Sequence, residues 1–244
     1  MGKQCLIISL ALNGYQLTYH QHLKTHQRYA NRIGAEHLLV TKPFISKLGV
    51  ECCWLKLYLT VEAMQQGYQH ILILDADAWV KSTAPDIRNE IVENKYIYMA
   101  KGYSERFNSG VMLVVNNKKS YEFLTNVINN RLMNIPSEDS VGWGENGHII
   151  HFAKRTNIVH ELPIEWNNTV STNIKDYICH QNHGPLRRSL TKRILHKYLA
   201  KISRFMTRLM VYSQSQTAPH LPTLLFLNEL KTIVKAYPLL SQHD

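Results

Sequence analysis

The sequence lacks the patterns that mark several protein classes. Its four cysteines contain no C-x-x-C pair, and Cys52 and Cys53 are adjacent, so we expect neither a disulfide framework nor a zinc site, and we expect a reducing compartment. No run of about 18 apolar residues occurs, which argues against a membrane-spanning helix. The apolar run from Cys5 to Leu12 is too short for such a helix and has no small-residue cleavage site, so we interpret it as a first strand.

Acidic residues are missing from one stretch of the chain. The 244 residues carry a net charge of +10, and the segment from Arg187 to Arg208 holds eight basic residues and no acidic one. The rest of the chain is close to neutral, and the overall content of 45% apolar and 19% charged residues is ordinary for a folded protein. This break in composition predicts a core domain over residues 1–186 and a basic helical extension over residues 187–244.

Strand-like and helix-like segments alternate through the first two thirds of the sequence. Apolar patterning predicts strands at 5–12, 37–40, 71–74, 96–100 and 110–115, and helices at 15–33, 54–64 and 119–130. We expect Asn13 to cap the first of these helices. The alternation predicts an α/β fold, in which ligands bind beyond the carboxyl ends of the strands.

Two aspartates follow a buried strand. In the segment Ile71 to Asp77, the carboxylates of Asp75 and Asp77 are two residues apart, so in extended backbone they point the same way. Two like charges this close repel each other, and a cation is the natural compensation. Hard oxygen ligands suit Mg²⁺ or Mn²⁺ bound together with phosphate oxygens. The pattern therefore predicts a metal site, although two solvated aspartates in a turn would have the same local sequence.

A strand followed by D-x-D also occurs in haloacid-dehalogenase-like phosphatases. In those enzymes the pair follows the first strand, and Thr or Val stands two residues after the second aspartate. Here that position is Trp79, and the pair lies 75 residues into the chain. Both differences count against a phosphatase.

Four stretches in this order resemble GT-A glycosyltransferases, most closely the retaining families that include glycogenin and the lipopolysaccharide galactosyltransferases. They are Trp54 to Leu57, Leu74 to Ala78 (LDADA), Phe107 to Leu113 (FNSGVML), and Glu145-Asn146 followed by Leu162-Pro163 and Trp166-Asn167. Each motif is weak alone, and their order and spacing make the set specific. The resemblance implies a mixed sheet between helices, with a nucleotide-sugar donor and a divalent cation, Mn²⁺ or Mg²⁺.

The resemblance also implies roles for individual residues. Lys56 would bind the donor, Asn108 and Ser109 would hydrogen-bond the donor sugar, and Glu145 and Asn146 would lie near its anomeric carbon. The plain alternatives are a surface helix lysine for Lys56, a turn residue for Asn108, and a loop without a catalytic role for Glu145 and Asn146.

A third metal ligand in the family is a histidine near a glycine, followed by a basic residue. In the segment from Ile178 to Arg187, His180 fits this place if one residue is inserted, and His183 is the alternative. Arg187 stands where the family has a lysine that binds the diphosphate, and a guanidinium suits phosphate. The cation would thus be held by Asp75, Asp77 and one histidine.

The nucleotide-binding turn would follow the first strand. The resemblance places Ala11, Asn13 and Tyr15 there, with Tyr15 able to stack on the base, and Asp75 would contribute to the same donor site.

The basic stretch has the pattern of an amphipathic helix. Leu190, Ile194, Tyr198, Ile202, Phe205 and Leu209 form an apolar stripe, and the basic residues cluster on a separate face. Such a helix over 187–210 indicates docking on a membrane surface, with each basic residue contributing on the order of 1 kcal/mol near anionic lipid. Its apolar face could instead pack on the core. Because no nucleic-acid motif accompanies the charge, we expect no nucleic-acid partner.

Together these features predict a hexosyltransferase. We expect transfer from a UDP-sugar to a saccharide on a lipid carrier, with retention of configuration, in lipopolysaccharide or capsule assembly at the cytoplasmic face of a membrane. The alternatives are a D-x-D phosphatase and a non-catalytic sugar-binding or membrane-associated protein that keeps the GT-A fold.

Overall fold

The computed structural model describes residues 3–141 and 144–180, six single positions between 194 and 205, and residues 221–240. Its strands are β1 (Cys5–Leu10), β2 (Glu36–Val40), β3 (His70–Leu74), β4 (Ala78–Val80), β5 (Ile97–Lys101), β6 (Phe107–Val115), β7 (Val159–Glu161) and β8 (Ile178–His180). Its α-helices are α1 (Tyr15–Thr18), α2 (His20–Ile33), α3 (Leu55–Gln65), α4 (Lys118–Asn129), α5 (Asn146–Ala153) and α7 (Leu221–Ala236). Short 3-10 helices are η1 (Gly49–Trp54), η2 (Ile87–Glu90), η3 (Ile164–Trp166) and η5 (Pro238–Leu240).

Six strands form a mixed central sheet in the order β2-β1-β3-β6-β5-β7. β1 runs parallel to β2 and β3, and β5 runs parallel to β7, whereas β6 is antiparallel to both of its neighbours. β4 and β8 pair antiparallel in a separate two-stranded sheet. The carboxyl end of β3 therefore opens directly onto β4, which is the place where the two aspartates lie.

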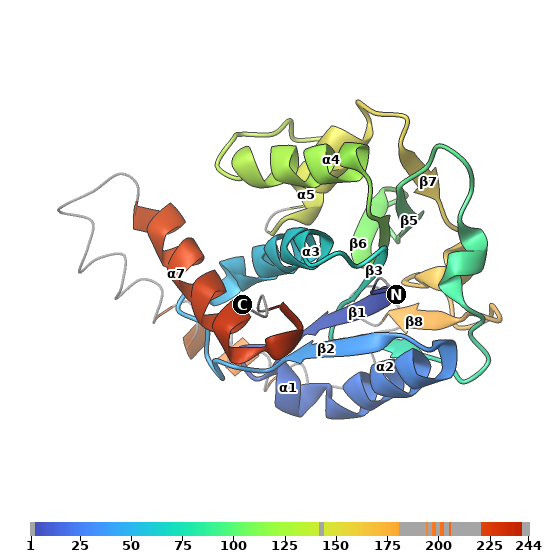
Figure 1. Ribbon diagram of the computed structural model, residues 1–244, viewed down its shortest axis with the longest axis horizontal. Helices are drawn as coiled ribbons and strands as arrows, with labels where there is room; N and C mark the ends of the chain where they lie inside the picture. The colour runs from blue at the N-terminus through green and yellow to red at the C-terminus, as the bar shows by residue number, and fades with distance from the viewer. Residues whose placement is uncertain are drawn as a thin grey trace.

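Apolar side chains on both faces of the central sheet form two cores. In β1, Leu6 and Ile8 belong to one core and Ile7 to the other, as the two-residue period of a strand requires. α3, α4 and α5 lie over one face, and α2 lies over the opposite face (Figure 1). Burial on both sides explains why the strands are continuous apolar runs in the sequence.

The predicted first helix is divided in the structure. α1 and α2 are separated at Tyr19, which has φ −113° and ψ 20°, outside helical geometry. The expected cap at Asn13 is wrong: Gly14 precedes α1 with φ 88°, and the cap makes no side-chain hydrogen bond. The amide of Asn13 instead bonds Ser46 N and Gly49 O in the segment after β2.

The C-terminal helix α7 packs on the core domain. Its Phe226 stacks on the Tyr58 ring of α3 at 5.2 Å, and Phe226 and Ile233 are both buried. Figure 1 shows α7 beside α3, in red near the C-terminus. The proposed boundary at residue 187 stays a prediction, because residues 181–193 lie outside the described part of the chain. Among the described residues, no helix has the length and apolarity needed to cross a bilayer.

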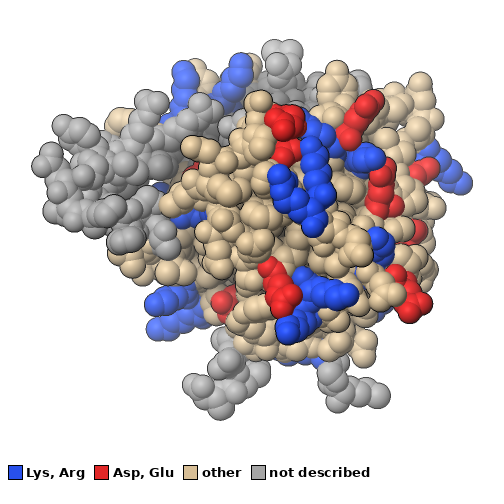
Figure 2. Space-filling model, turned by 90° about the horizontal axis from the view of Figure 1, so that it is seen from above, with Lys and Arg blue, Asp and Glu red and all other residues tan. Residues whose placement is uncertain are grey.

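Acidic and basic side chains lie next to one another on the face seen from above (Figure 2). Independently of this view, Lys118 and Glu122 of α4 form an exposed pair at 3.8 Å. Such a mixed surface agrees with the near-neutral charge of the sequence outside 187–208.

Candidate metal and donor site

The two aspartates occupy the turn between β3 and β4. Asp75 N donates to Gly110 O of β6 at 2.8 Å, and Ala78 N donates to Asp75 O at 2.9 Å, which fixes the turn backbone. Asp77 is 7% exposed, and the side chain of Asp75 is 32% exposed. The turn therefore presents one enclosed carboxylate and one that solvent and a ligand can reach.

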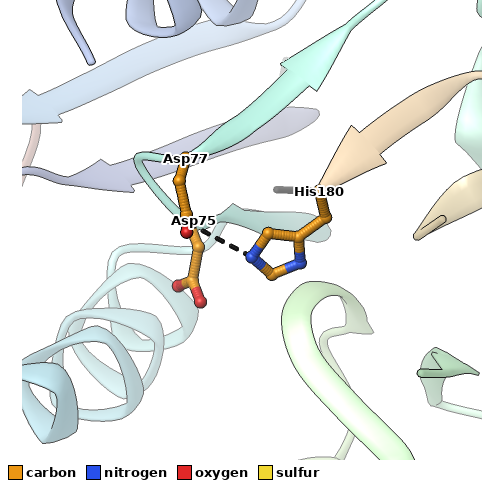
Figure 3. A group of neighbouring side chains, drawn as sticks. All are labelled: Asp75, Asp77 and His180. Atoms are coloured by element: carbon orange, nitrogen blue, oxygen red, sulfur yellow. Dashed lines mark hydrogen bonds and ion pairs between the residues drawn. The ribbon is translucent and has the colours of Figure 1, made fainter. Parts of the chain in front are cut away.

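His180 completes a group of three side chains that could hold a metal ion, drawn in Figure 3. β8 pairs with β4 so that His180 lies opposite Ala78, the residue after Asp77. One ligand atom from each of Asp75, Asp77 and His180 lies within 4.8 Å of the others. Residues that are about 100 positions apart in the sequence thus meet because of the register of the small sheet.

Asn167 orients the His180 ring. His180 Nδ1 donates to Asn167 Oδ1 at 2.8 Å, and Nε2 lies 3.2 Å from Asp77 Oδ1. Asn167 follows η3, whose Trp166 is fully buried and donates to Glu90 Oε1 at 3.0 Å. An Nδ1 that is committed as a donor leaves Nε2 as the nitrogen available to a metal ion.

The charges of this group support each other. Burial alone would lower the pKa of His180, but the charge of Asp77 and its hydrogen bond outweigh burial and raise this pKa. Burial would raise the pKa of Asp77, but His180 lowers it by charge and hydrogen bond. Two carboxylates and an imidazole are a donor set that fits Mn²⁺ or Mg²⁺, and the imidazole suits Mn²⁺ better.

Gly110 makes room for the histidine. A Cβ atom at this position would lie 2.0 Å from His180 Cε1 and 2.7 Å from His180 Nδ1. Because no side chain fits there, the glycine of the FNSG segment is required by the position of His180. The structure thus identifies His180 as the group that approaches Gly110.

A second charged cluster adjoins Asp75. Lys56 of α3 is 4% exposed, and its Nζ lies 2.9 Å from Asp75 Oδ1, 2.7 Å from Glu145 Oε1 and 3.4 Å from Ser109 O. Ser109 Oγ donates to the same Glu145 oxygen at 2.8 Å. These contacts use the three donors of the ammonium group. Lys56 is thus a buried bridge between two carboxylates and not the surface lysine that was the plain alternative.

The pKa directions agree with this bridge. Burial would lower the pKa of Lys56, but the charges of Asp75 and Glu145 raise it well above its usual range. Burial would raise the pKa of Glu145, but the Lys56 charge and hydrogen bond lower it. Lys56 is therefore charged and Glu145 ionised at neutral pH.

The amide side chains near this cluster are bonded to the antiparallel strand β6. Asn146 Oδ1 accepts from Ser109 N at 2.8 Å, and Asn146 Nδ2 donates to Phe107 O at 3.1 Å. Asn108 Oδ1 accepts from Gly110 N at 2.9 Å and from Asn167 Nδ2 at 3.1 Å. Asn108 and Asn146 therefore join β6 to its surroundings, and their predicted contacts with a donor sugar stay predictions.

The predicted nucleotide turn lies next to the metal group. Ala11 is fully buried, and its backbone N donates to Val40 O at 2.9 Å. Tyr15 is partly buried, its ring lies 5.3 Å from that of Tyr19, and burial followed by the charge of Asp77 raises its pKa. Ala11 and Ala76 belong to one buried cluster and Tyr15 packs against it, so this turn lies beside the residue between the two aspartates.

Comparisons with known proteins identify the architecture. No protein-family model matches the sequence, and no curated protein does. Among solved structures, the chain is similar to a glycosyltransferase involved in glycosylation of the major capsid of PBCV-1, with TM-score 0.57 and 12% identity over 80% of this chain and 98% of that one. It is also similar to the apo glycosyltransferase GlyE of Streptococcus pneumoniae TIGR4, with TM-score 0.54 and 13% identity over 88% of this chain and 65% of GlyE. The chain has the GT-A fold.

In this structure the D-x-D turn follows the third strand, β3, and not the first strand as in the phosphatase alternative. His183 and Arg187 lie outside the described residues, so the structure shows His180 in the group without testing the other two. Resemblance to one particular GT-A family also stays a prediction.

One residue of the site had no role assigned from the sequence, and a second has a contact that the sequence did not predict. Asn167 belongs to the Trp-Asn motif, which we used only as a marker of resemblance, and its contact with His180 connects elements that are 13 residues apart. The feature of the sequence that could have pointed to Asn167 is a polar residue directly after a large aromatic one. Ser109 was assigned to the donor sugar, whereas the structure shows its hydroxyl bonded to Glu145.

Proposed function

We propose that the protein is a metal-dependent glycosyltransferase that transfers a hexose from a nucleotide sugar, a UDP-sugar, to a saccharide acceptor. The observation that carries the proposal is the group of Asp75, Asp77 and His180 at the end of β3 in a GT-A fold. Two solved structures of similar architecture are those of glycosyltransferases, which supports the proposal.

The site residues have distinct tasks in this proposal. Asp75, Asp77 and the Nε2 of His180 hold Mn²⁺ or Mg²⁺, which supplies positive charge beside the diphosphate leaving group. Lys56 keeps the carboxylates of Asp75 and Glu145 at fixed positions, and its charge offsets their repulsion. The partly exposed Asp75 is the ligand that the donor can reach.

The sugar would lie between β6 and the start of α5. Ser109 and Glu145 are bonded to each other there, and Asn146 is held against the β6 backbone. We propose that Glu145 and Asn146 flank the anomeric carbon, with Asn108 and Ser109 along the sugar, and that the configuration is retained. Proton NMR of the first product formed distinguishes retention from inversion.

Nucleotide-sugar turnover tests the function directly. The full chain is incubated with a panel of nucleotide sugars and Mn²⁺, and release of nucleoside diphosphate is measured. We expect release from a UDP-sugar, loss of the signal with a chelator, and a fall of about 100-fold or more in Asp77→Asn. The matched control is Asp86→Asn, which removes a carboxylate that pairs with Arg88 outside the site.

Failure would take a clear form. If no nucleotide sugar is turned over or stabilises the chain against heat in the presence of Mn²⁺, the proposed function is wrong. Hydrolysis of simple phosphate esters would instead favour the phosphatase alternative, and saccharide binding without turnover would favour a non-catalytic protein.

We also propose that the acceptor is carried by a lipid and that the basic segment docks on a membrane, on its cytoplasmic face. The six described positions between 194 and 205 are helical and exposed, and they include four apolar side chains: Ile194, Tyr198, Ile202 and Phe205. Lys197 and Lys201 belong to the same segment. Exposed apolar residues beside basic ones suit the surface of an anionic bilayer.

Vesicle binding tests this second proposal. We expect the chain to sediment with anionic vesicles and much less with neutral ones, because the basic residues require negative lipid. Replacing Tyr198 and Phe205 with serine should weaken sedimentation without changing thermal stability, since both side chains are exposed. Equal sedimentation of the variant and the native chain would reject the docking surface.

A further inference from the structure

The segment from Thr41 to Gly49 borders the predicted nucleotide turn. Asn13 N donates to Phe44 O at 2.9 Å, Asn13 Nδ2 donates to Gly49 O at 2.8 Å, and Ser46 N donates to Asn13 Oδ1 at 2.8 Å. Asn13 has φ 55°, a left-handed conformation that asparagine tolerates. We call this segment the 41–49 loop. Its position relative to the nucleotide turn is fixed by these bonds to one side chain and its backbone.

The other side of the 41–49 loop is held by the C-terminal helix. The Glu229 carboxylate of α7 accepts from Ser46 Oγ and from Lys47 N, the latter at 3.0 Å. Ser46 Oγ in turn accepts from Leu48 N at 3.0 Å. A loop outside the sheets needs partners for its buried N–H groups, and α7 supplies them from about 180 residues later in the chain.

A second contact follows α7. The Tyr237 hydroxyl accepts from Thr41 N at 2.9 Å and from Lys42 N at 3.2 Å. Thus the start and the middle of the 41–49 loop are bonded to side chains from the last described segment, and its end at Gly49 is bonded to Asn13. The helix is itself anchored in the core through Phe226 and Ile233, so it is a firm support.

The burial of Glu229 indicates a requirement beyond packing. Ser46 is fully buried and Glu229 is 7% exposed. A buried carboxylate is costly unless it is well hydrogen-bonded, and burial raises the pKa of Glu229 although Ser46 and Lys47 N oppose this. An apolar residue at this point of α7 would pack without that cost, but it would leave Ser46 and Lys47 N without their acceptor.

We propose that Glu229 and Tyr237 are positioning residues for the nucleotide half of the donor. They hold the 41–49 loop against Asn13, so that the turn which receives the nucleoside diphosphate is formed before the ligand arrives. A site that is ordered before the ligand arrives binds more tightly, because no free energy of binding is used to order it. The inference rests on the proposed function, since it assumes a nucleotide at the Ala11 to Tyr15 turn.

Glu229→Gln tests the inference with a small change of shape. We expect the Kd for UDP with Mn²⁺ and the KM for the donor to rise about tenfold, with kcat within about twofold, because the metal group and Lys56 are not altered. Ser46→Ala should act similarly, and the double variant should be little worse than either single one. The matched control is Glu122→Gln, an exposed glutamate of helix α4.

Amide hydrogen exchange gives a readout that does not depend on activity. In the protein without ligand, Lys47 N should exchange faster in Glu229→Gln, and Thr41 N and Lys42 N should exchange faster in Tyr237→Phe. Tyr237→Phe removes only the hydroxyl, so it serves if Glu229→Gln fails to fold. A donor KM and UDP affinity that are unchanged in these variants would overturn the inference.

UDP binding by the native chain and the variants distinguishes failure of the positioning role from failure of the proposed function. If the native chain binds UDP and the variants bind it equally well, the positioning role is wrong and the proposed function stands. If the native chain binds no nucleoside diphosphate, the proposed function fails, and the inference fails with it.

Discussion

Two buried histidines contact the Asp75–Ala78 turn, and their partners there differ in charge. His180 of β8 has Nε2 3.2 Å from the Asp77 carboxylate, whereas His26 of α2 donates from Nε2 to the Ala78 carbonyl at 2.7 Å. Both are fully buried. Asp77 raises the pKa of His180, while burial lowers that of His26 to about 3. A facing carboxylate thus distinguishes the proposed metal-ligand position of His180 from the position of His26.

The partners on the remaining ring nitrogens support the same distinction. His180 Nδ1 donates to Asn167, which leaves Nε2 for a metal ion. His26 Nδ1 accepts from Ser9 Oγ at 2.8 Å, so both of its nitrogens are occupied by neutral groups that join β1, α2 and β4. His26 therefore joins elements of the scaffold around the turn, whereas His180 has the contacts that the proposed metal site requires.

Replacing each histidine in turn with alanine is the strongest test of this comparison. His180→Ala should reduce Mn²⁺ affinity by more than the about 10- to 100-fold expected for a residue that only orients a ligand. His26→Ala should leave the Mn²⁺ affinity of the folded protein nearly unchanged. It should lower the free energy of unfolding by about 1 to 3 kcal/mol for each buried partner left unpaired. Calorimetric Mn²⁺ titration and urea unfolding measure the two effects, and equal metal binding in both variants would break the distinction.

Gly110→Ala probes the space that His180 occupies. The added Cβ would meet the imidazole at 2.0 Å, so the ring must move away from Asp77. We expect Mn²⁺ affinity to fall by about 100-fold. This is the upper end of the loss expected when a residue that orients a ligand is removed, because here the ligand itself is displaced. Gly67→Ala is a control without a steric neighbour within 4 Å, although its φ of 84° makes it a test of backbone strain. Unchanged metal binding in Gly110→Ala would contradict the packing of His180.

Asn167→Ala removes the group that orients His180 and keeps the ligand itself. We expect Mn²⁺ affinity to fall by about 10- to 100-fold, because the ring loses its preferred tautomer and orientation. Asn167→Asp should restore much of the affinity, since a carboxylate also accepts from Nδ1. The prediction is checked by the same titration, and a variant that binds Mn²⁺ as the native chain does would remove Asn167 from the site.

The smallest expected effect is the change of the free energy of unfolding with pH. His26 and His37 have pKa values lowered by burial to about 3 and about 4. Their unfolded forms bind protons below about pH 6.5 while the folded forms stay neutral, so their stabilising contribution is present above pH 6.5 and is lost as pH falls. We expect a slope of up to about 1.4 kcal/mol per pH unit for each histidine between pH 6 and 4. In His37→Gln, the free energy of unfolding measured in urea should depend less steeply on pH. The slope should fall by up to about 1.4 kcal/mol per pH unit, which corresponds to one proton.

Local patterns were sufficient for several of the longer elements and for the aspartate pair, whereas β4, β7, β8 and α5 were not predicted. β3 begins one residue before its predicted range, and α4 lies within one residue of its prediction at each end, because apolar periodicity is a local property. The D-x-D turn was equally local, since its two carboxylates follow a strand directly. The division of the first helix at Tyr19 was missed, and nothing in the structure explains it.

The rest of the site depends on contacts between distant segments. The sequence offered Lys56 as a donor-binding residue, and the structure shows that it bridges Asp75 and Glu145, which lie 19 and 89 positions away. Asn13 was expected to cap a helix, and it bonds the 41–49 loop instead. Such pairs are set by strand register and loop packing, which no window of one sequence reports.

A crystal structure with Mn²⁺ and UDP tests the central claim most directly. The account predicts an anomalous manganese peak with Asp75, Asp77 and His180 Nε2 at about 2.0–2.3 Å, and UDP phosphate oxygens on the same ion. A manganese ion bound elsewhere, or UDP bound without an ion between these three side chains, would contradict it.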